Sequence, residues 1–266
     1  MTNADLHREE VFHDEWAEQI DVDSYPVDEH FTAQTAPEGR YIAGWLGDVR
    51  GKRFLDLGCG AGEAAVYFAK QGAIATASDL SPGMLQVAHR LAARHGVTIA
   101  TAQSPSDALP FPSGSFDIVY AGNVLHHVDA VATMDEVKRV LVKGGAFVSW
   151  DPLAHNPLIN IYRRMATEVR TVDEAPLRIA DVAKFQARFA EVDTRCFWFS
   201  TLWIFIRFFA IERVDPNRER YWKKIIKEHR RLAPIHRRLE RVDTMLLRAL
   251  PFLGRYCWNI AVCSRS

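Results

Sequence analysis

The stretch Phe54-Leu-Asp-Leu-Gly-Cys-Gly-Ala-Gly-Glu63 contains a strand, a glycine turn and the start of a helix within ten residues. The pattern predicts a short buried strand over 53–57 and a helix over 63–71. Glycines at alternate positions allow positive φ angles and let backbone N–H groups approach a ligand closely. Asp56 lies at the end of the strand, and Glu63 stands where the dinucleotide-binding turn G-x-G-x-x-G has its third glycine. The turn therefore favours a cationic ligand without phosphate over a pyrophosphate.

Strands and helices alternate along the rest of the chain. A second strand, 73–80, contains Asp79 near its end, about twenty residues after the turn, where a carboxylate can hydrogen-bond the ribose hydroxyls of an adenosine-containing ligand. Ser81 is predicted to cap the helix that follows it. A third strand is expected over 97–101, and 109–121 is expected to be a turn that leads into a fourth strand. Further strands are expected over 146–150, 190–200 and 256–264. This alternation predicts an α/β fold with a doubly wound, mostly parallel sheet, whose ligand lies at the carboxyl ends of the strands.

Several groups of residues together carry a more specific signal than any one of them alone. They are DLGCGAG (56–62), Asp79-Leu80-Ser81 with Met84, LPF (109–111) with SFDIV (115–119), LHH (125–127) and KGG (143–145). With these motifs the span 40–151 resembles the class I S-adenosylmethionine-dependent methyltransferases. It is most similar to the methyltransferase type 11 group, which includes the ubiquinone- and menaquinone-biosynthesis enzymes. The resemblance implies a Rossmann-like sheet of seven strands, six parallel and one antiparallel, with S-adenosyl-L-methionine as the cofactor and S-adenosyl-L-homocysteine as the product.

The resemblance also implies a set of cofactor contacts. These are Asp56, Gly58, Cys59, Gly60, Asp79, Leu80, Met84, Ser106, Asp107 and Asn123. The methionine part would lie at the glycine turn, the ribose at Asp79, and the adenine against Leu80 and Met84. Pro105 stands where the family often has an aspartate for the adenine amine, so Ser106 or Asp107 would take that place. NAD binding through Asp79 is the alternative, and the glycine pattern speaks against it.

Methyl transfer from a sulfonium depends mainly on aligning the acceptor with the methyl group, so few side chains are obligatory. A general base helps when the acceptor is a hydroxyl, and histidine suits that role near neutral pH. His126 and His127 follow the fourth strand, and because neighbouring side chains diverge we predict that His127 faces the pocket. A structural role of the pair in fixing this loop is the alternative. Asp151 and His155 are further catalytic candidates, and no carboxylate cluster indicates a metal.

The segments outside the cofactor half are expected to form the acceptor site. Tyr25 and His30 are predicted to reach the acceptor from the N-terminal segment, which shows no convincing apolar stripe and so is not expected to form a long buried helix. Asn156, after the fifth strand, is a third candidate, with a helix start as its alternative role. The predicted organisation is a single domain over 1–266. It divides into an N-terminal cap segment (1–40), the cofactor core (40–151), acceptor-side helices (152–190) and a helical insertion (201–254).

The interval between the last two strands predicts this helical insertion, because it is far longer than a hairpin loop. It begins with the aromatic run 197–211, which is too short and too interrupted to span a bilayer. The stretch 218–248 then interleaves basic and apolar residues. Such a segment suits peripheral attachment to an anionic membrane or a lid over an apolar pocket, and a solvated helical cap would have the same pattern. Binding of nucleic acid is disfavoured because the chain is not basic overall.

Composition is typical of a globular protein, with 48% apolar and 25% charged residues and a formal net charge of zero. The charge is unevenly distributed, since residues 1–50 hold 12 acidic and 3 basic residues, and residues 195–266 hold 16 basic and 6 acidic residues. Four cysteines without metal-ligand spacing and an N-terminus without an apolar signal segment predict a reduced, cytoplasmic protein. It is expected to be a monomer or a homodimer.

These observations predict methyl transfer from S-adenosylmethionine to a small, apolar or lipid-like acceptor, at oxygen rather than at nitrogen or carbon. The preference for such an acceptor depends on the aromatic and basic insertion. One alternative is a tailoring methyltransferase that acts on a soluble secondary metabolite. Another is a non-catalytic scaffold protein that binds the cofactor without turnover.

Overall fold

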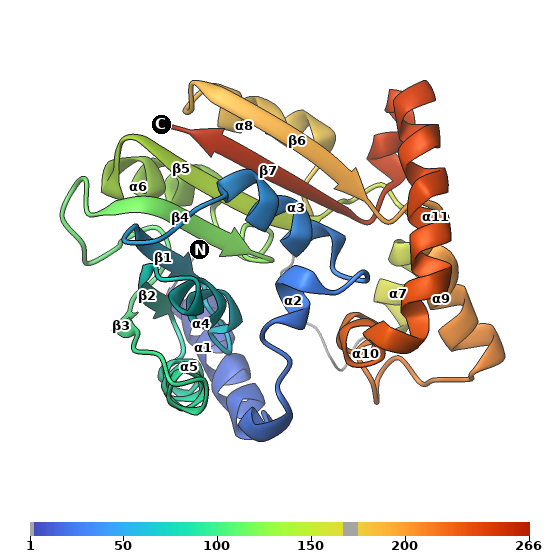
Figure 1. The fold of residues 1–266 in the computed structure, drawn as a ribbon, viewed down its shortest axis with the longest axis horizontal. Helices are drawn as coiled ribbons and strands as arrows, with labels where there is room; N and C mark the ends of the chain where they lie inside the picture. Colours follow the sequence, from blue (N-terminus) through green and yellow to red (C-terminus); the bar gives the residue numbers. More distant parts are fainter. Residues whose placement is uncertain (1–2, 167–174) are drawn as a thin grey trace.

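The computed structural model describes residues 3–166 and 175–266 and contains a central β-sheet with helices on both faces (Figure 1). Within this described part the sheet has seven strands in the order β3-β2-β1-β4-β5-β7-β6. The strands are β1 (Arg53–Leu57), β2 (Ile74–Asp79), β3 (Ala100–Gln103), β4 (Phe116–Gly122), β5 (Leu141–Pro152), β6 (Glu191–Phe197) and β7 (Asn259–Arg265). β7 is antiparallel to both β5 and β6, and the other neighbouring strands are parallel. The predicted α/β sheet with one antiparallel strand is confirmed.

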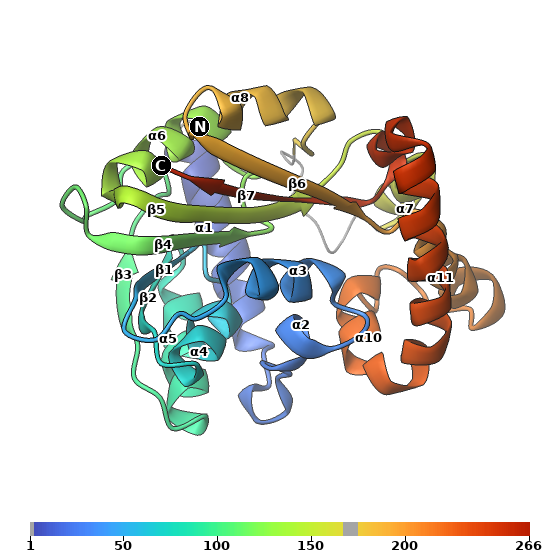
Figure 2. The same ribbon diagram turned by 45° about the horizontal axis from the view of Figure 1, so that its top comes forward.

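Helices cover the sheet on both sides (Figure 2). They are α1 (Asn3–Glu18), α2 (Glu29–Thr32), α3 (Pro37–Leu46), α4 (Glu63–Lys70), α5 (Pro82–Arg94), α6 (Ala130–Val140), α7 (Pro157–Met165), α8 (Val182–Gln186), α9 (Trp203–Ile206), α10 (Tyr221–Lys227) and α11 (His229–Ala249). α3, α4 and α5 pack against one face, and α6 and α8 pack against the other. Side chains alternate between the two faces along each strand, so Phe54 and Ile118 enter the first core and Leu55 and Val119 enter the second.

Most predicted elements form where the sequence places them. β1 has the predicted bounds, and the Ser81 hydroxyl caps α5 by accepting a hydrogen bond from the Met84 N–H at 3.0 Å. β5 is longer than predicted, because the Lys143-Gly144-Gly145 turn forms an irregularity within a strand that pairs with β4 on both sides of it. Gly144 has the positive φ of 75° that such a bend requires.

The N-terminal segment forms a long helix that is mostly not buried, because only Glu9 and Ala17 among its described side chains are buried. α1 spans 16 residues and lies against α5. Its contact with α5 is partly polar. Ala17 packs in one cluster with the buried Met84, and the Asp14 carboxylate accepts hydrogen bonds from the Ser81 hydroxyl and the Gly83 N–H. The sequence lacks an apolar stripe because a carboxylate at the start of α5, where the helix dipole favours negative charge, replaces much of the apolar contact.

Helices α9, α10 and α11 follow β6 and lie beyond one end of the sheet (Figures 1 and 2). Asp243 of α11 ties this group to the chain that leaves β6, because its carboxylate accepts N–H bonds from Phe199, Ser200 and Thr201 at 2.6–3.3 Å. No helix in the described ranges has the length and apolar character needed to span a bilayer. Residues 167–174, within the segment predicted to form acceptor-side helices, lie outside the described residues.

Gly39 allows α2 and α3 to pack closely. A Cβ atom at this position would lie 1.9 Å from the backbone oxygen of His30, far inside van der Waals contact. Gly44, in the same helix, is exposed, and a Cβ atom there would meet nothing within 4 Å. The two glycines therefore have different consequences, since packing requires Gly39 and Gly44 only lowers the helix propensity of α3.

We expect Gly39→Ala to lower the free energy of unfolding by about 2–3 kcal/mol, because α2 and α3 must separate to admit the methyl group. Gly44→Ala is the matched control and should raise the free energy of unfolding by about 0.5–1 kcal/mol through helix propensity. Urea unfolding followed by circular dichroism measures both. Equal effects of the two substitutions would contradict the packing argument.

Candidate active site

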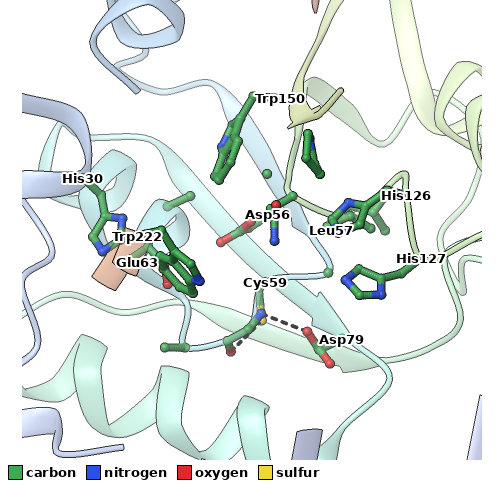
Figure 3. Close-up of a pocket in the computed structure, with 18 of the residues that line it drawn as sticks. His30, Asp56, Leu57, Cys59, Glu63, Asp79, His126, His127, Trp150 and Trp222 are labelled. Atoms are coloured by element: carbon green, nitrogen blue, oxygen red, sulfur yellow. Dashed lines mark hydrogen bonds between the residues drawn. The ribbon is translucent and has the colours of Figure 1, made fainter. Parts of the chain in front are cut away.

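A cavity of about 330 Å³ opens at the carboxyl ends of β1, β4 and β5 and at the start of β7 (Figure 3). The strand residues Asp56, Tyr120, Trp150 and Asn259 line it. Parallel strands bring their carboxyl ends to the same edge of the sheet, and β7 runs the opposite way, so its first residue joins that edge. Residues of α1, α2, α3, α7 and α10 contribute further walls.

The glycine turn borders the cavity beside β1. Gly58, Gly60 and Gly62 have φ angles of 63°, 50° and 81°, in the left-handed region that favours glycine. A Cβ atom at Gly60 would meet nothing within 4 Å, so this residue faces open space. The Gly60 N–H donates to Asp79 Oδ2 at 2.8 Å, and the Ser81 N–H donates to Asp79 Oδ1 at 2.9 Å. Asp79 thus holds the turn against the end of β2.

Three carboxyl groups line the cavity near the turn, from Asp56, Glu63 and Asp79. Burial and the neighbouring Glu63 raise the pKa of Asp56 well above its ordinary value, and burial raises the pKa of Asp79. Crowded carboxylates repel one another and are stabilised by a positive charge among them. The arrangement therefore fits a ligand that carries a cationic group. In the described ranges no group of three or more His, Cys, Asp or Glu side chains is placed to hold a metal ion.

Nine of the ten residues predicted to contact the cofactor line this cavity. They are Asp56, Gly58, Cys59, Gly60, Asp79, Leu80, Ser106, Asp107 and Asn123. Met84 is a correction to the prediction, because it is fully buried between α5 and α1 and does not line the cavity. Pro105 also lines the cavity, and the Ser106 hydroxyl lies 3.0 Å from Thr133 Oγ1. Contact with the cofactor itself stays a prediction for the nine.

His126 and His127 both line the cavity and lie on one side of the view in Figure 3. The expectation that only one of them would face it is therefore wrong. His126 is buried, and its Nδ1 lies 2.8 Å from Asp151 Oδ1. The centroids of the two imidazole rings are 4.0 Å apart, and His127 Nδ1 lies 3.9 Å from Glu9 Oε2. A catalytic role for His127 stays a prediction.

The structure places three of the predicted site residues away from the cavity. Asp151 is fully buried against His126, and burial raises the pKa of its carboxyl well above its ordinary value. His155 is exposed. Asn156 caps α7, because its Oδ1 accepts from the Ile159 N–H at 3.0 Å. The prediction that these three residues lie at the acceptor is therefore wrong. Asp151 orients His126, Asn156 caps a helix, and His155 faces solvent.

Tyr25 and His30 line the cavity together with Glu63. Their rings are stacked with centroids 6.0 Å apart, and Tyr25 Oη donates to Glu63 Oε2 at 3.3 Å. Burial lowers the pKa of His30, which favours its neutral imidazole. The structure thus brings both residues to the cavity, and their contact with an acceptor stays a prediction.

Comparison with known proteins identifies the part of the chain around this cavity. The profile of a protein family described as "Methyltransferase domain" matches residues 55–149. That span contains the glycine turn, Asp79 and both loop histidines. The chain carries a class I S-adenosylmethionine-dependent methyltransferase domain. The predicted family is thus confirmed for this span.

The curated relatives match less than half of the chain. Over 119 residues the chain is 37% identical to the ubiquinone biosynthesis O-methyltransferase of Methylocella silvestris, covering 45% of each protein. Over 120 residues it is 36% identical to an uncharacterised protein of Mycobacterium tuberculosis, covering 44% of each. The chain thus spans about half the length of these curated relatives. The solved structure of the YcgJ protein from Bacillus subtilis shares the fold with a TM-score of 0.53 at 21% identity, covering 85% of this chain and 98% of that one.

The cavity has two further polar residues that the sequence did not indicate, and both lie outside the matched span 55–149. Glu38 and Asn259 are both buried and line the cavity, and Asn259 Nδ2 donates to Glu38 Oε1 at 2.7 Å. Burial raises the pKa of Glu38 to about 7. Its spacing from Ile42, which puts both residues on one face of α3, is a signal that could have indicated a buried carboxyl. Nothing in the sequence pairs two residues that are 221 positions apart.

We expect the stability of the protein to depend on pH through Glu38. Its carboxyl titrates near 4.5 when unperturbed and near 7 in the fold, so between these values the folded state keeps a proton that the unfolded chain has released. The free energy of unfolding therefore falls as pH rises through this window, by up to about 3 kcal/mol, and the loss is nearly complete at about pH 8. Glu38→Gln should remove this part of the pH dependence.

Urea unfolding at pH 5 and at pH 8 measures this effect. Glu191→Gln, at an exposed position of β6, is the matched control. The difference in the free energy of unfolding between the two pH values should shrink in Glu38→Gln and stay unchanged in the control. A pH dependence like that of the wild type in Glu38→Gln would show that this carboxyl has an ordinary pKa.

Proposed function

We propose that this protein transfers a methyl group from S-adenosylmethionine to a small acceptor with an apolar or lipid-like body. The observation that carries the proposal is a single cavity that joins the carboxyls and the open glycine turn to a set of aromatic side chains. The aromatic lining includes Trp16, Tyr120, Trp150, Tyr162, Trp198, Trp222 and Trp258. When bound, a sulfonium cofactor would supply a methyl group on an already activated leaving group, so that the protein mainly has to align the acceptor with it.

The glycine turn and its neighbours would hold the cofactor. Gly60 faces open space at the cavity, which leaves room for a ligand against the backbone. Each oxygen of Asp79 accepts one backbone hydrogen bond and keeps a lone pair for a ribose hydroxyl. The carboxyls of Asp56 and Glu63 lie on the cavity wall, where a sulfonium would stabilise their charged form. Leu80 offers an apolar surface for the adenine.

The two loop histidines favour an oxygen acceptor. His127 lines the cavity and would accept the proton that an acceptor hydroxyl releases as its oxygen bonds to the methyl carbon. His126, bonded to Asp151, would fix the neighbouring ring. A tailoring methyltransferase for a soluble secondary metabolite and a non-catalytic cofactor-binding scaffold remain the alternatives. Turnover excludes the scaffold, and binding to membranes favours the lipid-like acceptor over the soluble metabolite.

Calorimetric titration with S-adenosylhomocysteine tests the cofactor assignment. Wild-type protein should bind it, and Asp79→Ala should weaken binding more than tenfold, because a hydrogen bond to a charged group contributes about 1.5–3 kcal/mol. Asp23→Ala, which removes an exposed aspartate that does not line the cavity, is the matched control and should bind like wild type. Failure of the wild type to bind would refute the proposed cofactor. Unchanged binding by Asp79→Ala would refute the ribose contact.

We also propose that the helical insertion contacts an anionic membrane, from which a lipid-like acceptor would enter. One exposed face of α11 carries Val242 and Met245, which are 44% and 72% exposed, together with Arg238, Arg241 and Arg248. Their spacing of three and four residues places them on the same side of the helix. Apolar side chains flanked by arginines suit the interface of an anionic bilayer. Further exposed apolar side chains of the insertion are Trp203, Phe209, Ile211 and Phe252.

Vesicle flotation tests the membrane contact. Wild-type protein should float with phosphatidylcholine vesicles that contain phosphatidylserine and stay behind with pure phosphatidylcholine. Arg241→Glu with Arg248→Glu should abolish flotation, because each arginine near the surface contributes about 1 kcal/mol and each glutamate adds repulsion. Arg90→Glu with Arg94→Glu, at exposed positions of α5 on the far side of the molecule, is the control (Figure 1). The contact is refuted if the wild type does not float or if the α11 variant floats unchanged.

A further inference from the structure

We infer that Glu38 and Asn259 form an acceptor subsite that takes a hydrogen-bond donor, a hydroxyl or N–H group, on a planar aromatic acceptor. This inference rests on the proposed function and narrows its substrate class. Both side chains line the cavity, and they are 8% and 3% exposed. They come from α3 and from the first residue of β7, and the 2.7 Å hydrogen bond joins them.

The subsite lies at the opposite end of the cavity from the glycine turn. Asp56 on β1 is in register with Tyr120 on β4, and Asn259 on β7 is in register with Pro152 at the end of β5. Three strand spacings of about 4.8 Å separate β1 from β7, which is about 14 Å across the sheet. Asn259, and with it the Glu38 carboxyl that it bonds, therefore lies on the side of the cavity away from β1.

Asn259 brings an unused acceptor atom to this end. Its Nδ2 donates to Glu38, and its Oδ1 is buried without a hydrogen-bond partner in the described part of the chain. Buried polar atoms without partners are rare in folded proteins, and each calls for an explanation. A donor on a bound acceptor would supply the missing bond. The Glu38 carboxyl is hydrogen-bonded to the amide of the same residue and, when ionised, offers a second acceptor at this place.

Aromatic rings around the pair give the subsite flat walls. Trp198 and Trp258 line the cavity with ring centroids 5.8 Å apart. Trp198 has a positive φ of 67°, a conformation that bulky side chains avoid. Such strain persists only where the surroundings fix it, and it is concentrated at functional sites. Here the Trp258 N–H donates to the Trp198 backbone oxygen at 3.1 Å and helps to hold the strained residue at the cavity.

Packing fixes Glu38 before an acceptor binds. The next residue, Gly39, lets the α2 backbone at His30 press against α3. The Asn259 amide then holds the carboxyl in one orientation. A polar pair that is already in place loses little conformational entropy when a ligand binds. A ligand without a donor leaves the Asn259 Oδ1 atom without a hydrogen bond. The subsite should therefore discriminate between acceptors by the presence of a donor rather than by size.

Calorimetry with two matched naphthalenes tests the subsite on the full chain, with and without saturating S-adenosylhomocysteine. 2-Naphthol carries a donor, and 2-methoxynaphthalene has the same rings and oxygen without the donor. Wild-type protein should bind 2-naphthol at least about tenfold more tightly, because the methoxy compound leaves the polar pair unsatisfied.

Two variants locate the preference. Glu38→Met with Asn259→Leu replaces both polar groups by apolar groups of similar size and should reduce the preference to about twofold or less. Glu38→Gln keeps the shape of the side chain, is expected to fold, and should reduce the preference in part. Glu191→Met, at an exposed position of β6, is the control and should keep the full preference.

Three outcomes would overturn the subsite: equal binding of both probes by wild type, binding of neither, or a preference that survives the double substitution. The proposed function is judged separately by S-adenosylhomocysteine. The double variant should still bind it, because β7 lies three strands away from β1, about 14 Å across the sheet. If wild type fails to bind S-adenosylhomocysteine while it still prefers 2-naphthol, the proposed function fails and the donor preference stands.

Discussion

Two carboxylates from adjacent strands hold the glycine turn, and the rest of the site depends on this arrangement. Asp56 accepts from the Ala65 N–H at 2.9 Å in the first turn of α4, and Asp79 accepts from the Gly60 N–H at 2.8 Å. The parallel register of β1 and β2 brings both carboxylates to one edge of the sheet. A turn held in this way keeps its left-handed glycines and leaves space beside Gly60. The cost is a cluster of buried negative charge, which a cationic ligand offsets.

Local signals in the sequence predicted the cofactor end of the molecule. The bounds of β1, the Ser81 cap of α5 and the position of Asp79 at the end of β2 each depend on residues that are close in sequence. The fold class was also predictable, because strands and helices alternate at intervals that allow a parallel sheet and little else. Such features depend on contacts between residues close in the chain, and these contacts can be predicted from the local residue pattern.

The acceptor end could be predicted only in part, because it is assembled from distant segments. α1 has no apolar periodicity to reveal it, since Asp14 binds the start of α5 through polar contacts. Glu38 and Asn259 meet only because β7 enters the sheet beside β5. His155 follows a strand end, which predicts that its backbone lies at the cavity edge of the sheet. The strand end does not determine whether the side chain points into the cavity, and His155 faces solvent.

β7 is the last strand in the chain but lies between β5 and β6 in the sheet, so the two ends of the cavity are expected to form at different times during folding. Gly60 and Asp79 are 19 positions apart in the chain, whereas Glu38 and Asn259 are 221 positions apart. Contacts between distant positions form late, because the entropy of closing the intervening loop must be overcome first. Loop-closure entropy therefore predicts that the glycine turn becomes ordered before β7 joins the sheet. The proposed acceptor subsite includes Asn259 of β7, so it forms only when β7 has joined the sheet. A partly folded molecule without β7 in place would bind the methyl donor and not the acceptor.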